Sequence, residues 1–190
     1  ASKGTTRLIS VEDIGILARS NGTAKELKNI LNDAGIPAIV MNDEKLLESG
    51  EVVAISKFLK AILEPNLSNI RQALLTHIMQ FDLDSIFQLD EAKVIHQFQL
   101  FKQIWIDNGI SALIRNLILQ FKIQEYLLSP NNASGKRQYA NILQLVEVMH
   151  KAVTHKHLHP EELYQWLQLG ISGALPAEDE YIVRIETDEK

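Results

Sequence analysis

The sequence contains no cysteine. This absence excludes disulfide bonds, thiolate metal ligands and a cysteine nucleophile together. A chain without disulfides suits a reducing compartment, so we expect the protein to be cytoplasmic. Size imposes no comparable limit, because 190 residues can bury a substantial core.

Long apolar runs and a surplus of basic residues are also missing. No stretch approaches the ~20 apolar residues that a membrane-spanning helix requires, so we expect no membrane segment. The polar residues 1–10 do not resemble a secretory signal. The formal net charge is -5, whereas a self-sufficient nucleic-acid-binding domain usually carries a strong basic surplus. If this chain meets DNA, its neighbours would supply most of the phosphate contacts.

The first part of the chain predicts a strand, a helix and a second strand. Residues 14–18 form a short apolar run between charged residues, as expected of a buried parallel strand. A helix is expected to begin at Asn21 or Thr23 and to end at Gly35. The apolar run 38–41 supplies the second strand, and the crossover between the two strands should be right-handed.

From residue 44 to residue 171 the strand signals disappear and apolar residues recur at helical spacing. We expect Gly109 to end one helix and Pro160 to stand at the first position of the last one. The predicted apolar stripes are Val52, Ile55, Leu59 and Ile62; Ile70, Ala73 and Leu74; Val94, Phe98, Phe101 and Trp105; Leu113, Ile114, Leu117 and Phe121; Tyr139, Ile142, Leu143, Val146 and Met149; and Leu163, Trp166 and Leu167.

A connector and a late strand follow the helices. Residues 170–180 combine glycine, proline and acids, and residues 181–186 alternate between apolar and polar side chains. Such a late strand indicates that the chain leaves a sheet domain, builds a helical insertion and begins to return. We therefore predict a mainly α fold with a small α/β part, in which a βαβ start at 1–43 precedes a helical insertion domain at 44–171 and a connector with a returning strand at 172–190.

Five segments form a recognisable series of motifs. They are 13–21 (DIGILARSN), 34–37 (AGIP), 48–52 (ESGEV), 137–147 (RQYANILQLVE) and 184–190 (RIETDEK). In this order and spacing they resemble the UvrD/Rep-type superfamily 1 DNA helicases, especially the RecB-like branch. The first segment is similar to the strand-and-arginine motif that begins the second RecA-like motor domain of that family. The resemblance covers nearly the whole chain.

The resemblance implies a segment of a longer ATP-dependent DNA helicase and exonuclease subunit that acts in double-strand-break repair and recombination. In that family ATP lies between two motor domains, and the arginine matching Arg19 reaches toward the γ-phosphate. No G-x-x-x-x-G-K-[ST] loop occurs here, and residues 134–137 lack its first glycine and its hydroxyl residue. The resemblance therefore implies ATP and magnesium in the parent enzyme, and neither cofactor nor hydrolysis in this segment alone.

Residue 18 departs from the pattern of the UvrD-type members. The residue before the arginine is often aromatic there and stacks on the adenine, whereas this chain has Ala18. We therefore expect no adenine stacking from this position. A small aliphatic residue is common among RecB-like members, which favours that branch.

Lys136 and Arg137 are the candidate DNA-binding residues. They stand at the expected start of a helix, after a polar loop, where a contact with a DNA phosphate is one interpretation and a solvated loop is the other. Cations at a helix N-terminus interact unfavourably with the helix dipole, so a function or a nearby acid would have to hold them there.

Other clusters have structural explanations. The histidines within residues 150–159 suggest a metal site at first, but a helix break interrupts them and no cysteine completes a set, so we predict no metal site. The aromatic residues within 98–121 follow helical spacing and are expected in the core. Asp82 and Asp84 are expected to cap a helix, and the acids at 178–180 to lie in a solvated linker. No catalytic residue is predicted.

Two interpretations of function stay open. The first is the helicase segment, which would meet DNA and the other subunits of a helicase-nuclease complex through its parent; an AddA-type helicase-nuclease or a UvrD-type helicase is its near alternative. The second is a free-standing helical module that binds a protein partner. A Walker-type loop upstream and a Thr-x-His-x-x-Lys-Gly motif just downstream would support the first interpretation, whereas a stop codon near Lys190 would support the second.

Overall fold

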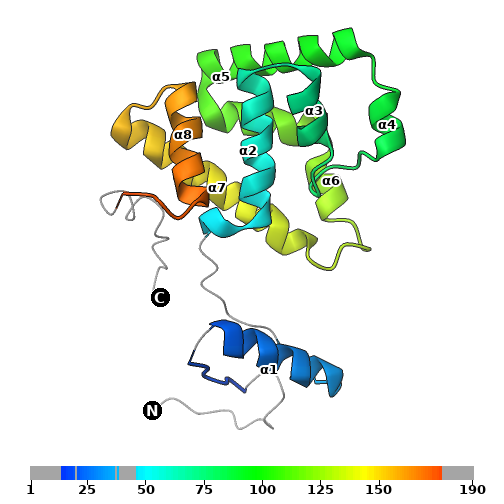
Figure 1. The fold of residues 1–190 in the computed structure, drawn as a ribbon, viewed down its shortest axis with the longest axis vertical. Coiled ribbons are helices and arrows are strands. Elements are labelled where there is room, and N and C mark those ends of the chain that lie inside the picture. Colours follow the sequence, from blue (N-terminus) through cyan, green and yellow to red (C-terminus); the bar gives the residue numbers. More distant parts are fainter. Residues whose placement is uncertain (1–13, 20, 37, 39–45, 177–190) are drawn as a thin grey trace, which may run out of the picture. The chain divides into compact units, whose positions relative to one another are not determined.

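The computed structural model describes residues 14–19, 21–36, 38 and 46–176 (Figure 1). The chain divides into two units, Ala1–Asp43 and Glu44–Lys190, and each is considered by itself. All regular structure in the described ranges is helical. The prediction of a mainly α fold is thus confirmed, and no described helix is long and apolar enough to cross a membrane.

The described residues of the first unit form one helix, α1 (Asn21–Asp33). Its end forms as predicted, because the amide of Gly35 donates to the carbonyl of Asn32 (3.0 Å) and the amide of Ile36 donates to the carbonyl of Leu31 (2.8 Å). These two bonds form a Schellman motif, which satisfies carbonyls that the helix leaves open.

The predicted βαβ start is not seen in the described residues. Residues 14–18 have no strand assignment and are exposed. A strand exists only through hydrogen bonds to a neighbouring strand, and the described part of this unit supplies none. Of the second predicted strand, 38–41, only residue 38 is described, and it has no strand assignment. The predicted returning strand, 181–186, lies outside the described residues.

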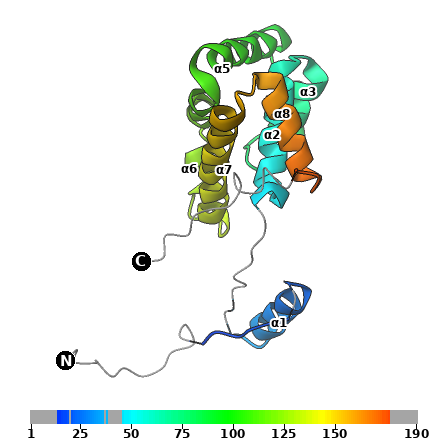
Figure 2. The ribbon, with the colours of Figure 1, turned by 90° about the vertical axis from the view of Figure 1, so that its left-hand side faces the viewer.

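The second unit is a helical assembly around α2 (Figures 1 and 2). Helix α2 contacts α3, α5, α7 and α8, as well as the short helix that precedes it. The elements of this unit are η2 (Leu46–Glu48), α2 (Gly50–Leu63), α3 (Leu67–Leu74), α4 (Leu83–Phe87), α5 (Glu91–Gln120), α6 (Ile123–Leu127), α7 (Gly135–Lys156) and α8 (Pro160–Ile171).

Most of the predicted apolar stripes form the core of this unit. The side chains of Val52, Ile55, Leu59 and Ile62 are at most 1% exposed, because positions three and four apart lie on one face of α2. The stripes of α3 and α8 are buried as well. Helix α8 begins at Pro160 as expected, and its capping box joins His159 and Glu162.

Helix α5 consists of two helical segments that meet at Gly109. This residue has φ 81° and ψ 177°, a conformation that side chains other than hydrogen rarely permit. The predicted break between two helices is therefore confirmed. Phe98 and Phe101 before the break join Phe58 of α2 and Phe121 in an aromatic cluster, with ring centroids 5.7–6.5 Å apart. The core interpretation of these aromatic residues is thus confirmed.

One predicted stripe was partly wrong. Leu143 of α7 is 45% exposed, whereas Leu145, which the prediction omitted, is fully buried. Helix α7 carries leucines and valines on more than one face, so periodicity alone allowed a neighbouring stripe. The buried line runs through Ile142, Leu145, Met149 and Ala152, because α7 packs against α2, α5, α6 and α8.

Gly135 fixes the start of α7 against the end of α6. A Cβ atom at this position would lie 1.6 Å from the backbone oxygen of Leu127, so the helix can approach only if residue 135 has no side chain. At Gly170 of α8 a Cβ atom would lie 2.5 Å from the Cδ1 atom of Leu47, a methyl group that can rotate away.

We predict that Gly135→Ala lowers the free energy of unfolding by about 1–3 kcal/mol or more, because the backbone of α6 or α7 must move to make room for the added methyl group. Gly170→Ala is the matched control. It should cost less, since a leucine rotamer can adjust and alanine favours helix over glycine by up to about 1 kcal/mol. Urea denaturation of both variants measures the difference, and equal losses would contradict the close-approach explanation.

Candidate functional site

Arg19, the candidate ATP contact, belongs to the first unit. Its side chain is exposed, and it follows residues 14–18, which have no helix or strand assignment, and precedes α1. An exposed guanidinium with five N–H donors can pair with a phosphate supplied from another part of a cleft. The described residues of this unit contain no phosphate-binding loop that could form an ATP site together with Arg19.

Lys136 and Arg137, the candidate DNA contacts, lie in the first turn of α7 in the second unit. Both are exposed, while the preceding Gly135 is buried against α6. The two cations therefore project from a helix start whose backbone is held by packing. This placement suits phosphate contacts that position a nucleic acid, which depend on charge rather than on base identity.

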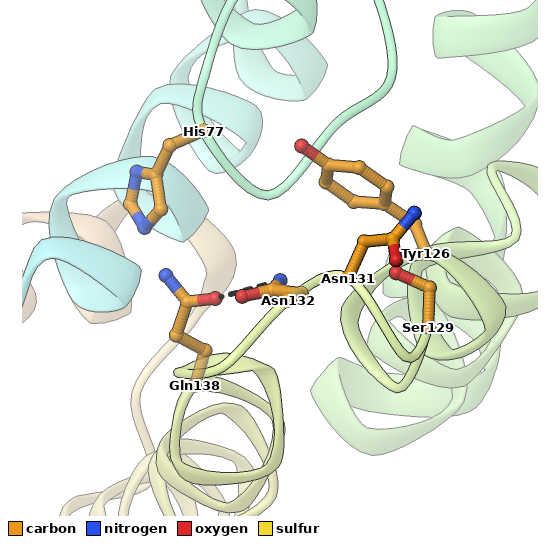
Figure 3. Close-up of a pocket in the computed structure, with 6 residues that line it drawn as sticks. All are labelled: His77, Tyr126, Ser129, Asn131, Asn132 and Gln138. Carbon is orange, nitrogen blue, oxygen red and sulfur yellow. Dashed lines mark hydrogen bonds between the residues drawn. The ribbon is translucent and has the colours of Figure 1, made fainter.

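A polar pocket lies beside this helix start (Figure 3). Its volume is about 390 Å³, and it is lined by His77, Tyr126, Ser129, Asn131, Asn132 and Gln138. The amide of Asn132 donates to Gln138 Oε1 (3.3 Å), and the hydroxyl of Ser134 donates to Asn132 Oδ1 (3.2 Å). These bonds order the loop that leads into α7.

The pocket offers hydroxyl, amide and imidazole groups and no carboxylate or cysteine. Such groups can bind neutral or anionic polar ligands, but they do not form a metal centre or an activated nucleophile. Within the described ranges, no group of three or more histidine, cysteine, aspartate or glutamate side chains could hold a metal ion. The sequence indicated the polar loop at 129–135, but not that His77 lines the same pocket.

A buried carboxylate on the neighbouring helix connects three elements. Glu51, in the first turn of α2, is 7% exposed. Its Oε2 atom accepts a hydrogen bond from Asn141 Nδ2 of α7 (3.0 Å), and its Oε1 atom lies 3.5 Å from His77 Nε2, between α3 and α4. We call Glu51, His77 and Asn141 the Glu51 cluster.

Two opposing effects set the pKa of Glu51. Burial acts to raise the pKa, but hydrogen bonds from Asn141, from the backbone amide of Glu51 and from His77 outweigh it and hold the pKa below its usual value. The carboxylate also lies at the N-terminus of α2, where a negative charge complements the helix dipole. Glu51 is therefore ionised at neutral pH although it is buried.

The Glu51 cluster joins two of the segments that carried the family resemblance. Glu51 belongs to segment 48–52, and Asn141 belongs to segment 137–147, one helical turn after Arg137. Sequence reasoning named both segments but missed their contact, because 90 residues separate the two side chains. The contact fixes the register of α7, and with it the position of Arg137, against α2.

The lowered pKa of Glu51 predicts a specific pH dependence of stability. Since the folded pKa lies below the ordinary value of 4.5, the stabilisation by ionised Glu51 is fully present above that pH and is lost as pH falls through the folded pKa. We expect the stability difference between wild type and Glu51→Gln to shrink below about pH 4.5. Urea denaturation from about pH 7 to about pH 3 measures it.

Glu147→Gln is the control for this experiment, because Glu147 is an exposed carboxylate on α7. It removes one negative charge without touching the Glu51 cluster. Parallel stability curves for wild type and Glu51→Gln at every pH would show that the cluster does not perturb the titration of Glu51.

Comparison with known proteins identifies relatives over nearly the whole chain. The RecBCD enzyme subunit RecB of Haemophilus influenzae is 27% identical over 195 residues, an alignment that covers 98% of this chain. The RecBCD enzyme subunit RecB of Escherichia coli is 28% identical over 190 residues, covering 96% of this chain. The chain spans only 16% of the length of each of these relatives.

A family comparison agrees with these relatives. Residues 3–109, more than half of the chain, match the UvrD-like helicase C-terminal domain. The match includes both the α1 unit and the helices from α2 to the first segment of α5. The resemblance to RecB-like helicases is thereby confirmed, and the chain belongs to the UvrD-like helicase C-terminal domain family.

Proposed function

We propose that this chain is a segment of an ATP-dependent DNA helicase subunit similar to RecB, which acts with partner subunits in the repair and recombination of double-strand breaks. The observation that carries the proposal is the alignment with two RecB subunits over 96–98% of the chain. In this proposal, residues 1–43 begin the second RecA-like motor domain, residues 44–171 are its helical insertion, and residues 172–190 return to the motor.

Arg19 contributes to ATP hydrolysis in the parent enzyme. A guanidinium that reaches the γ-phosphate stabilises the charge that spreads over the transferring group, and it senses the loss of that group. The phosphate loop that holds ATP and magnesium comes from outside these residues, because the chain has no G-x-x-x-x-G-K-[ST] sequence. This segment alone therefore hydrolyses nothing.

In the helicase that contains this segment, Arg19→Ala should lower kcat for DNA-stimulated ATP hydrolysis by about a thousandfold. Arg19→Lys should not restore it, since lysine cannot reproduce the planar, bidentate contact. Arg115→Ala, which removes an exposed arginine of α5, is the control. An unchanged kcat for Arg19→Ala would refute the ATP role.

Lys136 and Arg137 contribute phosphate contacts to DNA. Their exposure at the start of α7 supports this role, as does the rigid attachment of that start through Gly135 and the Glu51 cluster. The net charge of -5 limits these contacts to a part of the total, so other regions of the helicase supply the remainder. The helical insertion thus contacts DNA at one end and adjusts unwinding.

The double variant Lys136→Ala/Arg137→Ala should weaken DNA binding by the helicase and reduce its dependence on salt. The slope of log K against log salt should become shallower by about 0.9 for each duplex phosphate that the variant no longer neutralises. Fluorescence anisotropy at several salt concentrations measures the slope. Lys151→Ala, an exposed cation farther along α7, should leave the slope unchanged; an equal change for both variants would contradict a local contact.

The proposal extends to the complex as a whole. Both relatives are named as subunits of the RecBCD enzyme, so we place the parent of this chain in a comparable helicase-nuclease complex. The parent would translocate on DNA with energy from ATP and work in the cytoplasm. Copurification of partner subunits with the full-length protein, and ATP-dependent unwinding and exonuclease activity of that complex, test this part.

A further inference from the structure

Helix α4 lies at the edge of the second unit and exposes large apolar side chains (Figure 1). Leu83 is 62% exposed and Phe87 is 76% exposed. The two residues are four positions apart, so they lie side by side on one face of the helix. We call Leu83 and Phe87, together with Asp82 and Asp84, the α4 face.

Helix α4 is anchored to the rest of the unit by a buried side chain, by a ring contact of the preceding residue and by its N-cap. Ile86 of the same helix is 3% exposed, and Phe81 packs its ring edge against Phe121, with centroids 6.2 Å apart. Asp82 caps the helix, since its Oδ1 atom accepts a hydrogen bond from the amide of Ser85 (2.8 Å). Leu83 and Phe87 are therefore presented by an anchored helix, so a partner would not have to order them first.

The surroundings of this face are acidic. Residues 72–92 contain Asp82, Asp84, Asp90 and Glu91 and no lysine or arginine. Lys93 pairs with Asp90 (3.0 Å) and Arg71 pairs with Glu91 (3.0 Å), both from outside that stretch. Within the described ranges Asp82 and Asp84 have no such ion pair. These two carboxylates adjoin Leu83 in the sequence, so the exposed apolar pair lies next to negative charge that no described lysine or arginine pairs with.

We propose that the α4 face binds an amphipathic segment of a partner protein, in which apolar side chains cover Leu83 and Phe87 and lysine or arginine residues pair with Asp82 and Asp84. Charge decides between the possible occupants. DNA phosphates would be repelled by the same carboxylates, and a second copy of this face would place acids opposite acids. A basic, apolar protein segment satisfies both the apolar and the charged groups. This interface is additional to the ATP and DNA contacts of Arg19, Lys136 and Arg137.

The test uses the 190-residue chain with a synthetic amphipathic peptide of leucine and lysine, followed by amide NMR shifts. We expect shift changes centred on α4 and affinity that falls as salt increases. A leucine-glutamate peptide of the same length should not bind. Leu83→Ser/Phe87→Ser should weaken binding at least about tenfold, as for apolar residues central to an interface. Asp84→Lys should weaken binding of the lysine peptide and permit binding of the glutamate peptide.

Ile106→Ser/Leu119→Ser is the matched control, because these α5 residues are also exposed apolar side chains (58% and 70%). It should leave the affinity for the lysine peptide unchanged. The proposal is overturned if both double variants lose affinity equally, if the glutamate peptide binds wild type equally well, or if the shift changes lie outside α4. Sedimentation that shows dimers disrupted by Leu83→Ser/Phe87→Ser would overturn it in favour of self-association.

Discussion

Burial of α2 is the constraint on which the second unit depends. Only a narrow line of this helix, at Gly50, Val53, Lys57 and Lys60, is exposed, while the remaining sides contact α3, α5, α7 and α8. Burial of apolar area is worth roughly 25 cal/mol per Å², so a helix enclosed in this way contributes a large share of the core. The elements that carry candidate functional side chains in this unit, α7 and α4, are positioned by their packing against the core around α2.

The buried end of α2 adds specificity to this apolar packing. Apolar contacts tolerate sliding of one helix along another, whereas the hydrogen bond between Glu51 and Asn141 is satisfied in one register only. Leaving the Glu51 carboxylate buried without partners would be costly, so alternative packings of α7 are disfavoured. The start of α7, with Lys136 and Arg137, thus has a defined place relative to the pocket and to His77.

The α4 face, in contrast, is held only at its base and leaves its outer side for contact with other molecules.

Helix positions were predictable where the sequence carried strong local signals. Gly109 and Pro160 marked a break and a start because their backbone preferences act within one turn, and the stripe of α2 was buried as its spacing implied. The stripe of α7 was only partly correct, because the sequence offers adjacent apolar faces and the neighbouring helices select between them. The short helix α6 was not predicted, since five residues carry little periodic signal. For α4 the sequence indicated only the start, where Asp82 caps the helix as expected.

The sequence by itself determined the helical character of residues 46–171, most of the core and the family resemblance, because these depend on local spacing and on short motifs. Only the tertiary structure decided that Glu51 meets Asn141 and His77, that loop 129–135 forms a pocket, and that Phe87 is exposed while Phe98 is buried. Each of these facts depends on which distant segments pack together. Helical periodicity specifies a buried face but not the partner that covers it, so contacts across 90 residues arise only in the folded chain.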